Sequence, residues 1–383
     1  MLQKAFGFLR KFWNGYRENF LIVEQRNGSY EVTLASRNKK KKEIEIRKRF
    51  SVKNLSDLRR PLGKPGRLVF SLNSQSATTA ESVITLKRSR PENPVDEGEL
   101  DQLIYQGFWD FLNHHRGPAS KKMGTNAENL VLAYVQIREV YLGKQRIFNP
   151  VGFKGKELGL KIRGTFVSRE LLPVLGLFKK WGEIFVFESG SIFASVLPEG
   201  NNLLAYVGGE TVVAFGSSGG EQTFKASKNW GTDLFAKSVA SGWDISESAA
   251  RSITARYFEG KVSGHLGRYF ESRFRKDFEE LLDWLDSVKK KSGIDRPKLF
   301  YVFRYGPAVS SGYPRKLGGL PVRIDEELAR REYSLKIDGG AGDFSPLSDQ
   351  ETLAFLTFEY FLPKFDFLNQ LLKRRVRWLI PNF

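Results

Sequence analysis

The stretch LLAYVGGETVVAF, residues 203–215, constrains the fold of this chain more than any other. It places one apolar run before a paired glycine and a second apolar run after it. Such runs around a Gly-Gly step predict two strands joined by a tight turn. The backbone N–H groups of such a turn are able to point at an anion, and glycine lets the backbone approach it closely. The pattern therefore predicts either a phosphate-binding loop or a plain hairpin, and no acid precedes the glycines to hold a metal ion.

Composition excludes several kinds of site. A chain of 383 residues is long enough for two or more domains, and 41% hydrophobic residues indicate a globular fold. The absence of cysteine excludes disulfides, thiolate metal sites and cysteine nucleophiles, and three histidines do not readily build a metal site. The net charge of +18 favours an acidic partner, such as anionic lipid, nucleic acid or an acidic protein tail. We find no nucleic-acid readout motif, so we expect no specific nucleic-acid partner.

Both ends of the chain carry an aromatic, cationic helical stripe. In residues 1–20 and 363–383, apolar side chains recur every three or four positions beside cations. Such a helix either docks on the core or lies in the plane of a membrane. The second alternative makes candidate membrane-binding residues of Phe6, Leu9, Trp13, Phe365, Leu368, Leu372, Trp378 and Leu379. Because the chain shows neither the ~18 consecutive apolar residues of a transmembrane helix nor a secretory signal, we expect a cytoplasmic protein, peripheral on the inner face of the cytoplasmic membrane.

Between the two ends, strand-like and helix-like segments alternate. Residues 20–50 predict three strands with a hairpin turn at Asn27 and Gly28, and residues 274–291 have a strong helical periodicity. Mixed strands with interleaved helices predict an α/β or α+β class.

Several segments resemble, in order, those of the bacterial cell-division actin homologue FtsA. NPVGFKGKEL at residues 149–158 is similar to a loop and strand of that family's inserted subdomain, and FESGSIFASVL at residues 187–197 is similar to one of its helices. LLAYVGGETVVAF stands where the family has its second phosphate loop. GLPVRI at residues 319–324 and LSDQETLAFLTFEYFL at residues 347–362 resemble its closing strand and helix. The type IV pilus family PilM is a close competitor.

The resemblance implies an actin-like (ribonuclease H-like) α/β fold, with two lobes around a nucleotide cleft, an inserted small α+β subdomain of the SHS2 type and amphipathic terminal helices. The expected division is an N-terminal amphipathic helix at 1–19, a first lobe at 20–80 and 167–200, the inserted subdomain at 81–166, a second lobe at 201–362 and a C-terminal cationic amphipathic helix at 363–383.

The resemblance also implies a function. The family ties an FtsZ-like division filament to the cytoplasmic membrane and forms filaments itself. We therefore expect three partners: an FtsZ-like filament or other division protein, an anionic membrane surface, and further copies of the chain through self-polymerisation. An ATP-binding actin-like ATPase and a PilM-type pilus-assembly adaptor are the alternatives.

The residues that would hold ATP and Mg²⁺ in that family depart from its pattern. In the first loop Glu24 stands where the family has an aspartate, and in the second loop Tyr206 and Val213 stand at aspartate positions. Glycines and hydroxyls that could still wrap a phosphate remain in both loops. The resemblance thus leaves a vestigial or weak nucleotide site formed by Glu24, Gly28, Ser29, Gly208, Gly209, Thr211 and Gly306.

The positions that hold the nucleoside in that family also carry different residues in this chain. Arg251 and Thr254 stand where the family has Glu and Lys, and Tyr305 and Pro307 replace glycines. Since ATP hydrolysis needs acids to organise Mg²⁺ and water, we predict no catalytic residue, no metal ligand and no cofactor, with weakly bound ATP and Mg²⁺ as the alternative. An ATPase that uses non-standard ligands such as Glu24 is the competing hypothesis. Glu188 is either a general base or a structural acid.

Overall fold

The structure, a computed structural model, describes residues 17–26, 28–38, 40–58, 66–194, 197–198, 200–219, 221–258, 260–303, 319–321, 336–338, 352, 354–356 and 365–377. Most of the expected N-terminal helix therefore lies outside the described residues, and its last three positions, 17–19, begin a strand. Six of the predicted functional residues also lie outside them: Phe6, Leu9, Trp13, Gly306, Trp378 and Leu379.

The first sheet is built on an antiparallel meander that continues into parallel strands. Its strands are β1 (Arg17–Arg26), β2 (Ser29–Asn38), β3 (Glu43–Val52), β4 (Arg67–Leu72), β9 (Glu183–Glu188) and β15 (Lys336–Asp338), in the order β15-β3-β2-β1-β4-β9. The turn between β1 and β2 contains Gly28 at φ +63°, a conformation that glycine adopts without strain. The hairpin predicted at this point is therefore present.

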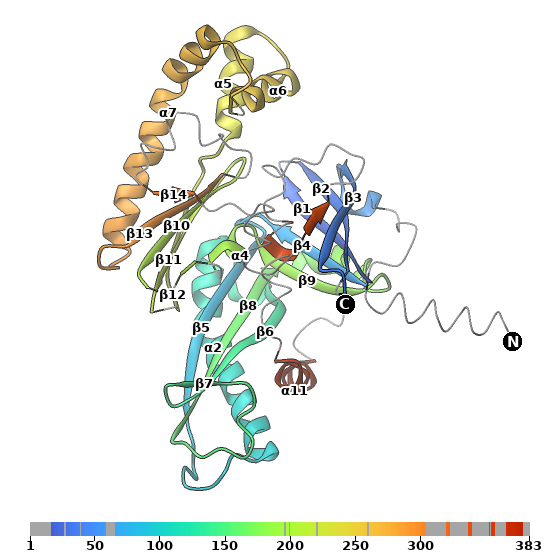
Figure 1. The fold of residues 1–383 in the computed structure, drawn as a ribbon, viewed down its shortest axis with the longest axis vertical. Coiled ribbons are helices and arrows are strands. Elements are labelled where there is room, and N and C mark those ends of the chain that lie inside the picture. The colour runs from blue at the N-terminus through green and yellow to red at the C-terminus, as the bar shows by residue number, and fades with distance from the viewer. Residues whose placement is uncertain are drawn as a thin grey trace, which may run out of the picture.

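The second sheet repeats this arrangement. Its strands are β10 (Asn202–Val207), β11 (Val212–Ser218), β12 (Glu221–Lys228), β13 (Lys298–Phe303) and β14 (Leu320–Pro321), in the order β12-β11-β10-β13-β14. In both sheets an antiparallel three-strand meander is followed by two parallel strands on the side of its first strand. The two sheets lie in two separate lobes (Figure 1), so the expected two-lobed α/β fold is confirmed.

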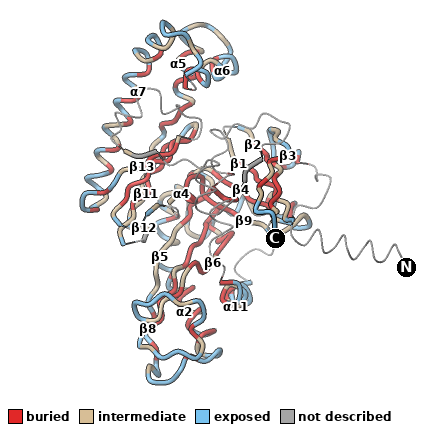
Figure 2. Tube along the Cα trace, viewed as in Figure 1, coloured by how far each residue is buried: buried red, intermediate tan, exposed pale blue. Residues whose placement is uncertain are grey.

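Strand β10 is buried on both faces, which explains why almost every position of the 203–215 hairpin is apolar. Ala205 and Val207 pack against the helices of the second lobe, which are α5 (Asp233–Trp243), α6 (Glu247–Phe258) and α7 (Gly264–Lys291). Leu204 and Tyr206 belong to the cluster that also contains the core of the first lobe. Successive side chains of a strand point to opposite faces, so both faces of β10 are buried. Figure 2 shows this burial along the strands of both lobes.

A third sheet with one long helix extends from the first lobe. It consists of β5 (Ala77–Lys87), β6 (Leu130–Leu142), β7 (Gln145–Ile147) and β8 (Glu157–Ser168), in the order β5-β8-β6-β7, and is covered by α2 (Glu97–Met123). A Cβ on Gly164 would stand 2.7 Å from the Phe111 ring, so this glycine lets α2 approach β8. We call residues 77–168 the inserted subdomain; the sequence-based boundaries were 81–166.

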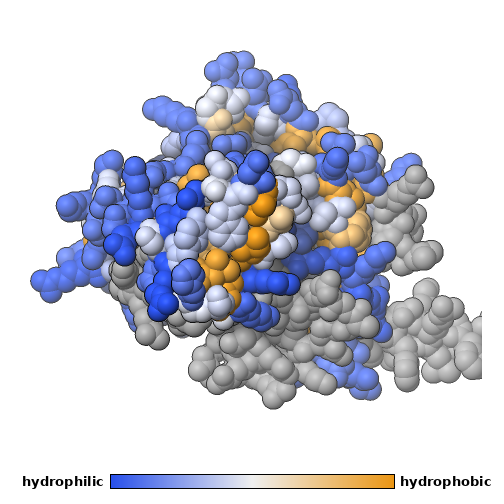
Figure 3. Space-filling model, turned by 90° about the horizontal axis from the view of Figure 1, so that it is seen from above, coloured by the Kyte–Doolittle hydropathy of each residue, from blue (hydrophilic) through white to orange (hydrophobic). Residues whose placement is uncertain are grey.

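The remaining elements are short. They are the 3-10 helices η1 (Leu55–Asp57), η2 (Ala127–Asn129) and η3 (Arg169–Leu171), and the α-helices α3 (Leu172–Gly176), α4 (Ser191–Ala194) and α11 (Asp366–Val376). None of the helices in the described part of the chain is long and apolar enough to span a bilayer. Seen from the α5–α7 end, the surface is mainly hydrophilic, with narrow apolar strips (Figure 3).

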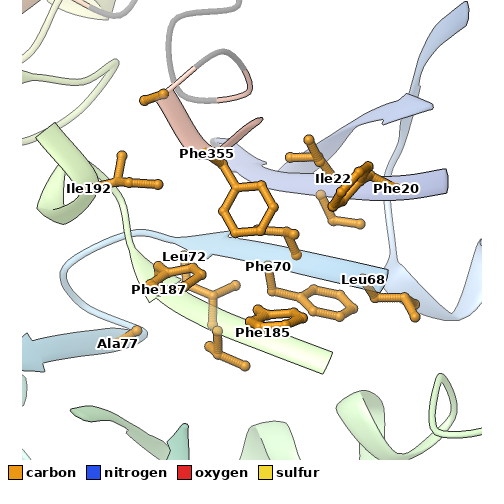
Figure 4. Close-up of a cluster of buried hydrophobic side chains, with 14 of the residues drawn as sticks. Phe20, Ile22, Leu68, Phe70, Leu72, Ala77, Phe185, Phe187, Ile192 and Phe355 are labelled. Carbon is orange, nitrogen blue, oxygen red and sulfur yellow. The ribbon is translucent and has the colours of Figure 1, made fainter. Parts of the chain in front are cut away.

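The core of the first lobe includes a residue from late in the chain. The ring of Phe355 makes edge or tilted contacts with Phe20, Phe185 and Phe187, at centroid distances of 5.9 to 6.0 Å. Figure 4 shows Phe355 beside the side chains of β1, β4 and β9. Each such aromatic contact adds about 0.5–1.5 kcal/mol to the free energy gained by burial. Residues from early and late in the chain are thus tied into one core.

The C-terminal helix α11 docks on the inserted subdomain. Its residues Phe365, Leu368 and Leu372 are between 0% and 4% exposed and pack among side chains of α2 and the third sheet. Phe365, Leu368 and Leu372, which the sequence predicts to bind a membrane, are covered by protein in this structure, and their membrane binding stays a prediction. Packing an amphipathic stripe against protein removes its apolar surface from water, as insertion into a bilayer would.

A buried ion cluster joins the inserted subdomain to both lobes. Glu188, at the end of β9, is 1% exposed, and its carboxylate pairs with Lys122 of α2 at 2.6 Å and with Lys225 of β12. It also accepts a hydrogen bond of 2.9 Å from the backbone N–H of Thr79 on β5. Burial raises the pKa of the Glu188 carboxyl, but the two lysines outweigh this and hold the pKa below its ordinary value. Glu188 is therefore structural, one of the two roles left open by the sequence.

We expect Glu188→Gln to destabilise the fold by about 3–5 kcal/mol, because it leaves two buried or half-buried ammonium groups without their counter-charge. Urea denaturation measures the change in the free energy of unfolding. Glu92→Gln, at an exposed acid of the inserted subdomain, is the matched control and should change it little. Equal effects of the two substitutions would contradict the structural role of Glu188.

Candidate functional site

The predicted hairpin is formed by β10, β11 and the four residues between them. Tyr206 lies opposite Val213 and Val207 lies opposite Val212, so 208–211 form the turn. The Gly208 N–H donates to the Thr211 carbonyl at 2.9 Å and closes this turn. The hairpin is thus present, and whether it holds a phosphate depends on what surrounds the turn.

The N-terminus of α5 is bonded to the turn itself. The N–H groups of Thr232 and Asp233 donate to the carbonyls of Gly208 and Gly209 at 3.0 and 2.8 Å. A Cβ on Gly231 would stand 2.2 Å from the Gly209 carbonyl oxygen, so the two segments pack backbone to backbone. The first N–H groups of a helix are a common anion-binding site. Here two N–H groups at the start of α5 are engaged by protein carbonyls.

The two positions that would carry metal-binding acids hold a buried apolar pair. Tyr206 and Val213, which face each other across the hairpin, are 2% and 1% exposed. The Tyr206 ring stacks on Phe193 with 6.0 Å between centroids and lies against Gly190, where a Cβ would stand 2.3 Å from the Tyr206 Cγ atom. Tyr206 is therefore a packing residue. Across the described residues, no group of three His, Cys, Asp or Glu side chains is placed to hold a metal ion.

The first loop contributes different residues from those predicted. Glu24 is 2% exposed and accepts a hydrogen bond of 3.1 Å from the Thr352 hydroxyl, within the core. The next residue, Gln25, faces the cleft and is held there, because its side-chain oxygen accepts from the Asn73 N–H at 3.1 Å. Glu24, Gly28 and Ser29 are not among the described residues that line the cleft. Their assignment to the nucleotide site is therefore not supported by the geometry.

The cleft is lined by both lobes and has a volume of about 210 Å³. The first lobe contributes the end of β1 and the loop after β4, and the second lobe contributes the hairpin turn, α5 and α6. Ligand pockets for drug-sized molecules usually measure about 300–1,000 Å³, so this space is small for a nucleotide. The lining residues are Gln25, Arg26, Asn73, Ser74, Ser189, Tyr206, Gly208, Gly209, Glu210, Thr211, Val213, Thr232, Asp233, Ala236, Arg251, Thr254, Ala255 and Phe258.

The two arginines of the cleft are already paired with acids. Arg26 pairs with Glu31 beside β1, and Arg251 of α6 lies 3.6 Å from Asp233 and 3.5 Å from Glu247. An incoming phosphate would compete with these carboxylates and with the acidic Glu210 of the turn. The electrostatics of the described cleft therefore do not favour a polyphosphate.

Sequence reasoning found part of this cleft. It placed Gly208, Gly209, Thr211, Arg251 and Thr254 at one site, and the structure brings these five together. It missed Asn73 and Ser74, which follow β4, and Asp233, Ala236, Ala255 and Phe258 on the two helices. The polar run LNSQS after a predicted strand was the available signal for Asn73 and Ser74.

We compared the chain with known proteins. No family model matches its sequence, and no curated protein matches it. Among solved structures, a PilM-PilN type IV pilus biogenesis complex matches with 12% identity and a TM-score of 0.48, over 93% of this chain and 98% of the other. A Bacteroides thetaiotaomicron protein with an actin-like ATPase fold matches at 11% identity and a TM-score of 0.41, over 90% and 98% of the two chains.

The ethanolamine utilization protein EutJ from Carboxydothermus hydrogenoformans matches at 11% identity and a TM-score of 0.40, over 89% of each chain. These similarities lie in the path of the backbone. The two-lobed α/β architecture of this chain is seen directly in its duplicated strand order and in the cleft between its lobes.

We expect Tyr206→Ala to destabilise the protein by about 3–5 kcal/mol, because it opens a cavity between Phe193 and Gly190 in a packed core. Urea denaturation measures this change. Thr211→Ala, in the same hairpin but at a half-buried turn position, serves as the matched control. A loss below about 1 kcal/mol in Tyr206→Ala would contradict the packing role.

Proposed function

We propose that this chain is an FtsA-like cytoskeletal adaptor with a degenerate nucleotide site. It links a division filament of the FtsZ type to the inner face of the cytoplasmic membrane. In this proposal the two lobes serve as a scaffold for protein contacts, and ATP turnover is not part of the function.

The observation that carries the proposal is the buried Tyr206–Val213 pair at the floor of the cleft. Phosphoryl transfer depends on positioning Mg²⁺ and water with carboxylates and on neutralising charge at the phosphates. A tyrosine ring and a valine supply neither. The fold retains the hairpin because its strands bury apolar surface on both faces.

The competing hypothesis of an ATPase with non-standard ligands loses its main candidate. Glu24 contacts Thr352 in the core and does not line the cleft. Glu188 is held between two lysines, so it is not available as a general base. The acids that do line the cleft are Glu210 and Asp233, and Asp233 is engaged with Arg251.

A PilM-type pilus-assembly adaptor is the second candidate function, because it shares the two-lobed architecture and differs in its partner. The two functions are separated by sedimentation with purified filaments. An FtsA-like adaptor should co-sediment with FtsZ-like polymers, and a chain that stays in the supernatant would favour the pilus-assembly candidate.

We expect purified protein to release no phosphate from ATP above background, with or without Mg²⁺, because the described residues bring together no group of acids able to hold a metal ion. A phosphate-release assay with isothermal titration of ATP tests this. Gly208→Val, which fills the turn, is the control and should behave as the unmodified chain does. Phosphate release that disappears in Gly208→Val would overturn the proposal and favour the ATPase.

We expect the full chain to co-float with anionic vesicles, because the stripe that contains Phe6, Leu9 and Trp13 combines aromatic and cationic side chains. A double substitution, Trp13→Glu with Trp378→Glu, should abolish flotation, since it places a charge on the predicted membrane face at each end. Equal flotation of the double variant would remove the membrane attachment from the proposed function.

A further inference from the structure

Helix α11 is docked by the described part of its apolar stripe. Four residues, spaced three or four positions apart, are 0% to 4% exposed and belong to the core of the inserted subdomain: Phe365, Leu368, Leu372 and Val376. The helix contacts α2 on one side and β6 on the other. At its start, Phe365 stacks on the otherwise exposed ring of Phe148 at 5.5 Å between centroids.

The cationic face of α11 is engaged as well. Arg374 and Arg375 both bond to the carboxylate of Asp101 on α2, the first at 3.2 Å, and Lys373 lies 2.6 Å from Glu183 on β9. The hydrogen bond from Arg375 holds the pKa of the Asp101 carboxyl below its ordinary value, so Asp101 is ionised at neutral pH. Arg375 also lies over the ring of Tyr105, 5.7 Å from its centroid.

A third contact fixes the position of the helix along the sheet. β7 pairs with β6 only at Val140, Tyr141 and Leu142, so the edge of β6 is open nearer its start. At Ile137 the side chain of Asn369 bonds to this edge. Its oxygen accepts from the Ile137 N–H at 2.8 Å, and its nitrogen donates to the Ile137 carbonyl at 3.0 Å. The asparagine thus takes the place of a neighbouring strand for one residue.

We propose that the inserted subdomain holds α11 as a latch, and that the docked helix and a helix lying on an anionic lipid surface are mutually exclusive states of the same segment. This inference rests on the membrane attachment proposed above. An in-plane helix uses an apolar face in the acyl boundary and cations at the headgroups. In the docked state, the subdomain covers that apolar face, and Asp101 and Glu183 occupy three of its cations.

The docked state is suited to exchange. Lys373, Arg374 and Arg375 have side chains that are 56%, 63% and 42% exposed, so their ion pairs are partly solvated and contribute little to stability. An anionic bilayer presents many negative charges in place of two carboxylates and attracts each nearby cation. The membrane therefore shifts the equilibrium toward the released helix by its differential affinity for that state.

The test weakens the latch without altering the membrane-binding faces of the helix. Asp101→Asn removes the counter-charge on α2 and leaves α11 unchanged. We expect it to raise the affinity of the full chain for phosphatidylglycerol-containing vesicles by about two- to fivefold, since loss of a partly exposed ion pair shifts an equilibrium by about that factor. Asp110→Asn is the matched control, because it makes the same charge change at an exposed position of the same helix. It should leave the affinity nearly unchanged.

A second variant guards against misfolding. Asn369→Ala removes the contact with Ile137 and keeps every apolar and cationic residue of α11, and it should also raise vesicle affinity. Hydrogen exchange supplies the direct readout. Anionic vesicles should speed exchange of the Ile137 amide in the unmodified chain, and vesicles of phosphatidylcholine alone should not.

Four outcomes would overturn the latch. One is an equal change of affinity in Asp101→Asn and Asp110→Asn, and another is vesicle-bound protein whose Ile137 amide keeps its protection. If the unmodified chain binds and Asp101→Asn does not bind more tightly, the latch fails and the proposed function stands. If neither protein binds anionic vesicles, the latch and the membrane part of the proposed function fail together.

Discussion

The Glu188 carboxylate, buried between Lys122 and Lys225, is the interaction on which the arrangement of the three sheets depends. Glu188 ends β9 of the first sheet, Lys225 lies on β12 of the second, and Lys122 is in the last turn of the helix that covers the third. Desolvation makes any one of these charges costly on its own, so each is tolerated only while the others are in place. A carboxylate in that position has no freedom to accept a proton from a substrate. Glu188 therefore has a structural role and takes no part in chemistry at the cleft.

The described cleft is lined by residues of both lobes, and its two central hairpin positions hold a tyrosine and a valine. The end of β1 and the loop after β4 in the first lobe face the hairpin turn, α5 and α6 of the second lobe around one space. Tyr206 fills the position next to Gly190 that a smaller acid would leave open, and the stack on Phe193 adds packing energy there. Since α5 already bonds the carbonyls of the glycine turn, the hairpin is rigid without a ligand.

Sequence reasoning predicted the hairpins, the α/β class and the association of Gly208 with Arg251, because each depends on local pattern or on order along the chain. It named Glu24, which contacts Thr352 in the core, whereas the next residue, Gln25, faces the cleft, because one step along a strand turns a side chain to the opposite face. Asn73 and Ser74 could not be assigned, because their place beside the glycine turn follows from how the two lobes meet. Gly28 and Ser29 form the expected turn, yet that turn does not line the cleft.

The C-terminal helix shows a different limit of sequence information. Leu368 and Leu372 form the same stripe whether the neighbour is a protein core or a bilayer, because the pattern records only that one face must leave water. What distinguishes the two is the complementary surface, and here that surface lies far away in sequence, at Asp101 on α2 and Ile137 on β6. The apolar and cationic faces of this helix are both matched by the protein surface on which it docks. That surface and an anionic bilayer therefore offer the helix the same chemistry. The location of the helix then depends on which of them offers more charge.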